Sequence, residues 1–335
     1  MTSSPTRWGI MGAGMISHDW AVAVSTLPTT EHQILAVSAR SKENAENFAR
    51  EHNIAKAYGS YAELCQDTNI DVIYIGTIHP EHLKLGKLAL DHGKHVLCEK
   101  PLCMNVKETV ELVNYARSKK LFFMEAIWSR FFPAYLKLKE EIDNGSIGEV
   151  VQVIAGMGLQ FPEDNWRRTK ELGGGTVIDM GTYCCQFASL VFSGLKPEKI
   201  IASGHLNSSG ADDSSSATII YPNGKTATLI THSQVNFPCE ALAIGTKGTL
   251  KLPFPFWATD KLETPNGVIE FALPKSDKKI NYWNSTGLSY QCQEVRRCIQ
   301  NGLTESPILT LDETVLLAEM RESIRKQIGV VYPTD

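Results

Sequence analysis

The sequence predicts an α/β protein that begins with a doubly wound, mostly parallel sheet and continues into an α+β region with an open, largely antiparallel sheet. In the first third, short apolar runs alternate with helical periods across short connections. After Pro133, strand-like runs follow one another with turn signals between them. Since 335 residues are enough for about two domains, we predict one domain over residues 5–127 and a second over 128–335.

Composition and charge restrict the class of protein. Hydrophobic residues make up 43% and charged residues 21%, as in ordinary globular proteins. The net charge of −4 argues against nucleic acid as a partner. The sequence has no apolar run of transmembrane length and no signal-peptide pattern, so we expect no membrane contact and a cytoplasmic location. The eight cysteines lack the spacings of a zinc site and are expected to be buried thiols.

The first domain is predicted from alternating strand and helix patterns. The near-continuous apolar run at 71–76 suits a parallel strand covered on both faces. Apolar positions at i, i+3, i+4 and i+7 over residues 45–52 mark one face of a helix. By the same reasoning, strands are predicted at 7–11, 34–37, 71–76, 95–98 and 121–124, and helices at 15–26, 45–52, 81–93 and 106–119.

The second domain is predicted to open with a helix from Pro133 to about Asn144. Strands are then expected at 150–155, 199–204, 217–221, 226–232 and 242–244, and helices at 175–192, 289–300 and 311–327. The segment Pro222-Asn223-Gly224-Lys225 is typical of a hairpin turn between two of the strands. Consecutive strands with short turns favour an antiparallel sheet with helices on one face.

A glycine-rich loop stands where the first strand meets the first helix. It reads Gly12-Ala13-Gly14-Met15-Ile16-Ser17. The first glycine permits a tight turn, the second lets the backbone approach a pyrophosphate, and the helix amino terminus offers N–H groups to phosphate. Ser17 replaces the usual third glycine or alanine and is still small. The strand–loop–helix context therefore predicts a Rossmann dinucleotide-binding domain in which Gly12, Gly14, Met15 and Ile16 contact the cofactor.

The end of the second strand predicts which nicotinamide cofactor binds. An NAD site usually has an acidic residue there to bind the ribose 2′-hydroxyl, but no carboxylate precedes Glu43. Arg40 stands there instead, 26 residues after Gly14. A guanidinium binds a 2′-phosphate with two hydrogen bonds, and Ser38 would add a donor. The sequence therefore predicts NADP.

Lys100 is the first candidate for chemistry. The segment Cys98-Glu99-Lys100-Pro101 directly follows an apolar strand, at the edge where open α/β sheets bind ligands. Proline restricts the conformation of the residue before it, which limits where the ammonium group points. A cation beside a nicotinamide would orient a substrate hydroxyl and favour its alkoxide.

Motifs along essentially the whole chain resemble one enzyme family. They are Gly12-Ala13-Gly14-Met15-Ile16, Glu99-Lys100-Pro101, Met124-Glu125-Ala126 followed by Arg130-Phe131-Phe132-Pro133, and Gly173-Gly174-Gly175-Thr176-Val177-Ile178-Asp179-Met180-Gly181-Thr182-Tyr183. In this order and spacing they resemble the glucose-fructose oxidoreductase / inositol dehydrogenase family. Segments such as Gly76-Thr77-Ile78-His79-Pro80-Glu81-His82 resemble its dimeric, NADP-dependent members more narrowly. That resemblance implies oxidation of trans-dihydrodiols of aromatic hydrocarbons or of D-xylose-type aldopyranoses by hydride transfer to NADP+.

The resemblance also implies roles for individual residues. Lys100 matches the catalytic lysine of the family, and Asp179 and Tyr183 match the pair in the second domain that completes the substrate site. Many relatives have histidine where Tyr183 stands. Residues carried over to the cofactor site are Thr77, His79, His82, Glu99 and Lys100.

The spacing of Asp179 and Tyr183 agrees with such a pair. They are i and i+4, so a continuous helix would place them on one face, one turn apart. A nearby ammonium group favours the phenolate form of tyrosine. We therefore expect Lys100 and Tyr183 to act as an acid–base couple, with Asp179 orienting substrate. Which of the two takes the proton stays open.

The remaining expectations concern the pocket, metal and assembly. Trp128 and Trp257, with Asp179 and Tyr183, are expected to line the pocket for a diol or sugar. His79 and His82 have no third ligand placed by sequence, so no metal is expected. The resemblance implies a homodimer formed through the sheet of the second domain. The alternatives are a dehydrogenase of another sugar or polyol and a non-catalytic NADP-binding sensor.

Overall fold

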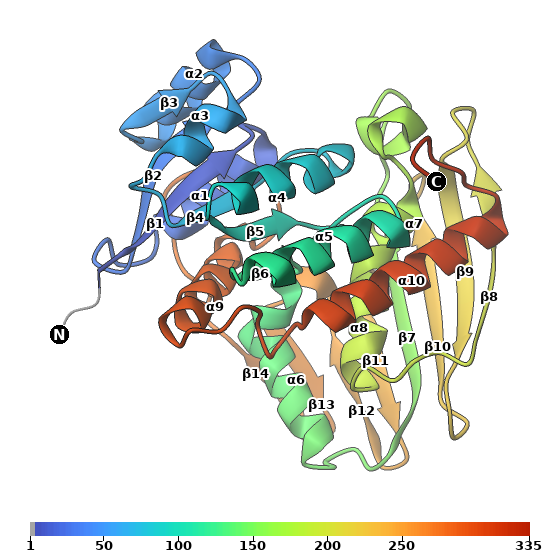
Figure 1. Cartoon of the computed structure of the whole chain (residues 1–335). Helices are drawn as coiled ribbons and strands as arrows, with labels where there is room; N and C mark the ends of the chain where they lie inside the picture. Colours follow the sequence, from blue (N-terminus) through green and yellow to red (C-terminus); the bar gives the residue numbers. More distant parts are fainter. Residues whose placement is uncertain (1–3) are drawn as a thin grey trace. The chain divides into compact units, whose positions relative to one another are not determined.

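The computed structural model describes residues 4–335 and divides them into two compact units (Figure 1). The first unit comprises residues 4–102, 108–128 and 273–311. The second unit comprises residues 103–107, 129–272 and 312–335. The first unit gives way to the second between Trp128 and Ser129, one residue after the predicted border at residue 127.

The predicted second domain, 128–335, is not continuous. Residues 273–311 return to the first unit, where helix α9 (Leu288–Gln300) packs against helix α1 (Met15–Val24). The buried carboxylate of Asp19 in α1 accepts hydrogen bonds of 2.9 Å from the backbone N–H groups of Asn281 and Tyr282. These contacts join segments more than 260 residues apart, which local sequence patterns do not report.

The first unit is built on a six-stranded, fully parallel sheet in the order β3-β2-β1-β4-β5-β6. This is the strand order of a Rossmann fold and confirms the predicted α/β class. The strands are β1 (Thr6–Met11), β2 (His32–Ser38), β3 (Lys56–Tyr58), β4 (Val72–Ile75), β5 (His95–Glu99) and β6 (Phe123–Ala126). The helices between them are α1, α2 (Lys42–His52), α3 (Tyr61–Gln66), α4 (His82–Asp91) and α5 (Val106–Lys119).

Two elements of the first unit escaped prediction. Strand β3 has three residues and helix α3 has six, too few to show a hydrophobic period. Helix α3 begins at a local signal, because the Ser60 hydroxyl accepts a hydrogen bond of 3.2 Å from the Glu63 N–H. Strand β6 begins at Phe123, two residues later than predicted.

The second unit is built on an eight-stranded sheet in the order β14-β13-β12-β11-β7-β10-β9-β8. All neighbouring pairs are antiparallel except β7 with β10, which confirms a largely antiparallel sheet. The strands are β7 (Val150–Gly158), β8 (Lys199–Leu206), β9 (Asp212–Ile220), β10 (Thr226–His232), β11 (Ala241–Gly245), β12 (Gly248–Leu252), β13 (Lys261–Thr264) and β14 (Gly267–Glu270). The predicted hairpin joins β9 to β10.

The helices of the second unit are α6 (Pro133–Asp143), α7 (Thr176–Asp179), α8 (Gly181–Val191) and α10 (Leu311–Ile328). Helix α8 contacts β7, β10 and β11, and Figure 1 shows it beside these strands. The side chains on one face of the sheet are almost fully buried; examples are Val153, Ala227 and Leu250. On the other face, Ile154 is 38% exposed and Ile201 is 48% exposed. One face of the sheet is therefore a core, and the other is open in this chain.

The predicted helix over 175–192 is two helices that meet at Met180. At this junction the Tyr183 N–H donates to the Met180 carbonyl (3.0 Å), an i to i−3 bond rather than the i to i−4 bond of an α-helix. The assumed continuous helical turn from Asp179 to Tyr183 is therefore wrong in detail.

Two further expectations concern the state of the cysteines and membrane-spanning helices. All eight cysteines are buried, and none is in a disulfide within residues 4–335. Among the helices of the described chain, none has both the length and the apolar character needed to cross a membrane.

Candidate functional site

The glycine loop after β1 has the backbone geometry of an anion site. Gly12 has φ +99°, and a Cβ atom there would lie 2.9 Å from the Gly76 carbonyl oxygen, so only glycine fits. Gly14 precedes α1, and a Cβ atom placed on it would meet nothing within 4 Å. The first turn of α1 carries no acidic side chain. Open space above a helix amino terminus without a competing carboxylate suits a pyrophosphate.

Ser17 performs the packing role expected of the third small residue. It is fully buried, and its Oγ atom would clash with any Cβ atom at Gly76, at the end of β4. The α1 helix and the β4 end are therefore close because the two facing residues are serine and glycine. The sequence motif identified Ser17 but not Gly76, its partner.

The end of β2 presents Arg40 to solvent and keeps Ser38 inside. The Ser38 hydroxyl is buried and donates toward the Ile10 carbonyl (3.4 Å), while its own carbonyl accepts the Gly12 N–H (2.9 Å). Ser38 thus supports the glycine loop through its carbonyl, and its role as a donor to the cofactor stays a prediction. Arg40 is exposed, and no carboxylate lies in the sequence between the end of β2 and Glu43 in the first turn of α2.

His82 connects two loops of the site. Its ring is fully buried, with Nε2 3.1 Å from the Thr77 carbonyl and Nδ1 3.0 Å from the Pro101 carbonyl. Burial lowers the pKa of His82. With both ring nitrogens facing backbone oxygens, His82 holds the Thr77 loop against the segment after Lys100. His79 is also buried, with its ring centroid 6.0 Å from that of His82.

Lys100 follows β5 directly and is anchored through Glu99. One Glu99 oxygen accepts the Tyr74 hydroxyl hydrogen (2.8 Å), and the other accepts the Lys100 backbone N–H (3.2 Å). The ring of Tyr74 stacks on Trp20 of α1, with centroids 4.3 Å apart. Glu99 is thus a positioning residue that connects the aromatic core to Lys100. Both of its oxygens accept hydrogen bonds within the protein, and its place in the cofactor site stays a prediction.

Burial raises the pKa of Glu99 to about 7, against the opposing effects of the Tyr74 hydrogen bond and the Lys100 charge. A second buried carboxylate, Glu125, accepts the Leu102 N–H through Oε1 (2.9 Å). The Lys100–Pro101 peptide bond between these anchors is cis. In the sequence Glu125 is recognisable only as part of a motif; its contact with Leu102 depends on the pairing of β5 with β6.

The second unit holds Asp179 and Tyr183. The Asp179 carboxylate accepts a hydrogen bond from Arg167 Nε (3.2 Å), a partner that the sequence analysis did not predict. The Arg167 guanidinium lies over the Trp166 ring, 4.8 Å from its centroid. The ring of Tyr183 lies 6.2 Å from that of Trp257, and both side chains are buried. An acid, a guanidinium, a phenol and aromatic rings are groups that bind a polyhydroxylated ring.

Asp212 fixes the helix that carries Asp179. Its Oδ2 atom accepts hydrogen bonds from the Thr176 hydroxyl (2.6 Å) and the Val177 N–H (2.7 Å) at the start of α7. Gly175 has φ +144°, and a Cβ atom there would lie 2.5 Å from Asp212 Oδ1. The last residue of the glycine triplet therefore makes room for a carboxylate that caps the helix. Burial raises the pKa of Asp212.

The predicted residues thus form two sets. Gly12, Thr77, His82, Glu99, Lys100 and Trp128 belong to the first unit, in which His82 contacts both Thr77 and Pro101, the residue after Lys100. Asp179, Tyr183 and Trp257 belong to the second.

We predict that Glu99→Gln changes the pH dependence of stability. Between about pH 4.5 and pH 7 the native carboxyl, with its pKa of about 7, keeps its proton. The same group in the unfolded chain has the ordinary pKa of 4.5 and has lost its proton in this range. Native stability then falls as pH rises from about 4.5 to about 7, by up to ~3 kcal/mol for this group. Calorimetry from about pH 5 to about pH 8 should show Tm of the variant rising relative to the unmodified protein. Glu46→Gln on the exposed face of α2 is the control, and parallel curves for all three proteins would contradict the assignment.

Comparison with known proteins places these features in context. Residues 6–127 match the model described as "Oxidoreductase family, NAD-binding Rossmann fold", and residues 135–251 match the "GFO/IDH/MocA C-terminal domain". The chain is 42% identical to the trans-1,2-dihydrobenzene-1,2-diol dehydrogenase of Xenopus tropicalis, over 98% of this chain and 99% of that one. It is 43% identical to the mouse (Mus musculus) protein of that name, over 98% of each chain.

Solved structures share the fold at lower identity. A levoglucosan dehydrogenase in complex with NADH and levoglucosan superposes with a TM-score of 0.85 at 18% identity, over 97% of each chain. A 3-ketoreductase from Actinomadura kijaniata in complex with NADP superposes with a TM-score of 0.81 at 22% identity, over 98% of this chain and 99% of that one. Two matched domains and full-length relatives at more than 40% identity show that this chain is an NAD(P)-dependent oxidoreductase of the Gfo/Idh/MocA family.

Proposed function

We propose that the protein is an NADP-dependent dehydrogenase that oxidises trans-dihydrodiols of aromatic hydrocarbons, D-xylose-type aldopyranoses, or both. The observation that carries this proposal is the position of Lys100 at one sheet edge with the glycine loop. Met11, Ile75 and Cys98 are in register on the adjacent parallel strands β1, β4 and β5. The loops that follow them contain Gly12, Thr77 and Lys100, at the carboxyl edge where such sheets bind ligands.

The substrate class rests on the relatives. Proteins 42–43% identical over their full length are named trans-1,2-dihydrobenzene-1,2-diol dehydrogenases. The buried Tyr183 and Trp257 rings supply an apolar wall for a cyclic diol, and Asp179 with Arg167 supplies polar partners for its hydroxyl groups. The buried, unbridged cysteines fit a reducing compartment, and we propose a cytoplasmic location.

Arg40 supports NADP rather than NAD as the cofactor. It is exposed immediately after β2, and no carboxylate stands at the strand end to bind a ribose 2′-hydroxyl. The glycine loop and the α1 amino terminus would hold the pyrophosphate. When bound, NADP+ accepts the hydride from the substrate carbon.

We predict that Arg40→Ala weakens NADP+ far more than NAD+. Loss of a charge-assisted contact to the 2′-phosphate should cost about 1.5–3 kcal/mol, or roughly 10- to 150-fold in Kd. Calorimetric titration with each cofactor measures this, with Arg50→Ala on exposed α2 as the matched control. Equal losses for the two cofactors would show that Arg40 does not read the 2′-phosphate.

The proposed chemistry needs a base for the substrate hydroxyl. Hydride leaves the carbon only as the hydroxyl proton is removed, so a proton acceptor must reach that oxygen. We assign Tyr183 as the base and Lys100 as the cation that lowers its pKa and binds the developing alkoxide. Asp179, paired with Arg167, orients the neighbouring hydroxyl of the substrate.

We predict that Lys100→Met and Tyr183→Phe each lower kcat by about 10²–10⁴-fold while NADP+ still binds. The double variant should fall little further, because residues that act as one unit give non-additive losses. Steady-state kinetics with benzene dihydrodiol and D-xylose measure the effect. Lys119→Met and Tyr221→Phe are the matched controls, at an exposed lysine and a buried tyrosine. A near-normal kcat and pH profile for Tyr183→Phe would assign the proton to Lys100 or to a water that it activates.

The same assay separates the alternatives. If the protein oxidises another sugar or polyol but neither benzene dihydrodiol nor D-xylose, it is a dehydrogenase of that other substrate. A non-catalytic sensor would bind NADP+ and turn over nothing. Such a protein has no use for Lys100, Asp179 and Tyr183 together, which favours the enzyme.

We also propose that the chain forms a homodimer through the open face of its eight-stranded sheet. That face presents isoleucine and threonine rather than a dense array of charges; examples are Ile154, Ile201, Thr218 and Ile230. Exposed β-branched side chains across several strands favour burial against an identical face related by a two-fold axis.

We predict a dimer by light scattering at micromolar concentration. Ile201→Glu should shift the protein toward monomer, because the two-fold interface would then bury two unpaired carboxylates, one from each copy. Leu303→Glu, at an exposed leucine of the first unit, is the control and should leave the dimer intact. A monomer for the unmodified protein would overturn the assembly.

A further inference from the structure

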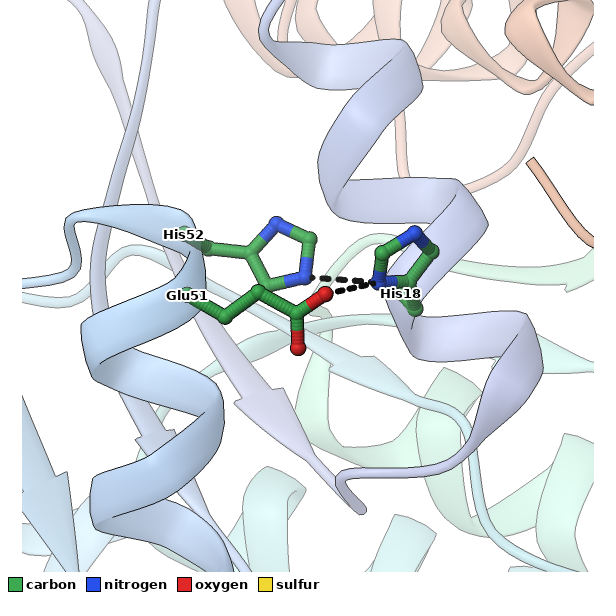
Figure 2. A group of neighbouring side chains, drawn as sticks. All are labelled: His18, Glu51 and His52. Carbon is green, nitrogen blue, oxygen red and sulfur yellow. Dashed lines mark hydrogen bonds and ion pairs between the residues drawn. The ribbon is translucent and has the colours of Figure 1, made fainter. Parts of the chain in front are cut away.

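Three side chains outside the site described above converge between helices α1 and α2. His18 lies in α1, one turn after Gly14, and Glu51 and His52 lie at the carboxyl end of α2 (Figure 2). Figure 2 shows the His52 ring and the Glu51 carboxylate both directed toward the ring of His18. Within residues 4–335, no other group of three histidine, cysteine or acidic side chains brings its ligand atoms within 4.8 Å of one another.

The distances in this cluster match those around a tetrahedral metal ion. His52 Nε2 lies 3.1 Å from His18 Nδ1, and Glu51 Oε1 lies 3.0 Å from the same His18 nitrogen. Two ligand atoms 2.0–2.1 Å from one tetrahedral Zn²⁺ are about 3.3 Å apart. The third pair of ligand atoms, on Glu51 and His52, also lies within 4.8 Å, so the three side chains are already gathered around one position.

The second nitrogen of His18 is held as in a metal-binding histidine. His18 Nε2 lies 2.9 Å from the backbone carbonyl oxygen of Lys279. A carbonyl can only accept, so Nε2 carries the proton, and in the neutral ring Nδ1 is an acceptor. This nitrogen can accept from His52, but the Glu51 carboxylate, 3.0 Å away, is a second acceptor, and a cation between the two would bind both. Metal-ligating histidines almost always donate their other N–H to such an acceptor, which fixes the ring and its tautomer.

The charges around the cluster affect how well it can bind a cation. Glu51 supplies the one carboxylate of the cluster, and its side chain is 58% exposed, so an ion can enter from solvent. The positive charge of Lys278 lies close to the cluster, and its Nζ atom donates to the Glu51 backbone carbonyl (3.5 Å). In the metal-free protein with both rings neutral, His52 Nε2–H donates to His18 Nδ1. When the metal binds both of these nitrogens, the His52 ring proton moves from Nε2 to Nδ1 of the same ring by exchange with solvent, so that both rings stay neutral.

We propose that His18, Glu51 and His52 bind one divalent transition metal ion, Zn²⁺ in the first instance, with water as the fourth ligand. Two imidazoles and a carboxylate suit zinc and its neighbours in the first transition row, and not Mg²⁺ or Ca²⁺, which take oxygen ligands. The ion ties α1, whose amino terminus forms the glycine loop, to α2, which begins just after Arg40. The Lys279 carbonyl adds residues 273–311 to this connection. The site is thus structural, within the cofactor-binding unit.

No metal is predicted from the sequence, because His79 and His82 have no third ligand placed by sequence. That pair is spaced as in many metal motifs, but His82 uses both ring nitrogens on backbone oxygens. His18 and His52 are 34 residues apart and meet only because α1 and α2 pack side by side.

The test uses the full, tag-free chain, dialysed against a chelator and then titrated with Co²⁺ and with Zn²⁺. We expect one equivalent of Co²⁺ to give the visible absorption bands of a four-coordinate ion, and Zn²⁺ to displace it. Zn²⁺ should also raise Tm, since an ion that binds only the native state stabilises it.

Matched variants distinguish this site from any other. Glu51→Gln keeps the shape of an exposed side chain and should weaken binding at least tenfold, and His52→Gln should do the same. His92→Gln, at an exposed histidine outside the cluster, should bind as the unmodified protein does. Unchanged stoichiometry and affinity in Glu51→Gln and His52→Gln would overturn the proposal, as would a sulfur-to-cobalt charge-transfer band or the absence of one-to-one binding. Because the readouts are spectroscopic and thermal, they are independent of whether the chain oxidises a diol or a sugar.

Discussion

The parallel register of β1, β4 and β5 is the constraint on which the cofactor-binding unit depends. Because Met11, Ile75 and Cys98 lie side by side, the three loops that follow them leave the sheet at the same edge. A one-residue slip would turn every side chain of a strand to its other face. The near-complete burial of these strands on both faces makes such a slip costly. The glycine loop and Lys100 are therefore brought to one edge by core packing.

Close contacts of Gly76 with Gly12 and Ser17 fix the backbone at that edge. Gly12 adopts a positive φ and packs on the Gly76 carbonyl, and Ser17 packs on Gly76 itself. The buried Glu99 then connects the Tyr74 hydroxyl to the Lys100 backbone. A carboxyl in this position is expensive to ionise, and the raised pKa of Glu99 is the consequence. The anchoring of Lys100 thus depends on a group whose charge changes near neutral pH.

In the second unit, Asp179 and Tyr183 are held in place by a capped helix and by packing against the sheet. Asp179 and Tyr183 stand on two short helices that meet at Met180, and neither helix has the length to be stable alone. Asp212 caps the first of them, and contacts with β7, β10 and β11 hold the second. Arg167 compensates the Asp179 charge and stacks on Trp166. The i to i−3 bond from Tyr183 to Met180 interrupts the regular helical turn between Asp179 and Tyr183.

Local patterns in the sequence were sufficient for the elements with a clear period and for the motifs within one loop. The strand over 226–232 and the helix over 106–119 were predicted with the observed bounds, and Gly12, Gly14 and Lys100 were placed at strand ends. The short β3 and the break at Met180 were missed, because three residues show no period and both short helices share one apolar pattern. Only the tertiary structure decided which distant groups meet. The return of 273–311 to the first unit, the Arg167 partner of Asp179 and the Glu51–His18–His52 cluster all join residues through packing. Sequence periodicity reports which face of an element is buried, and it carries no information about what that face is buried against.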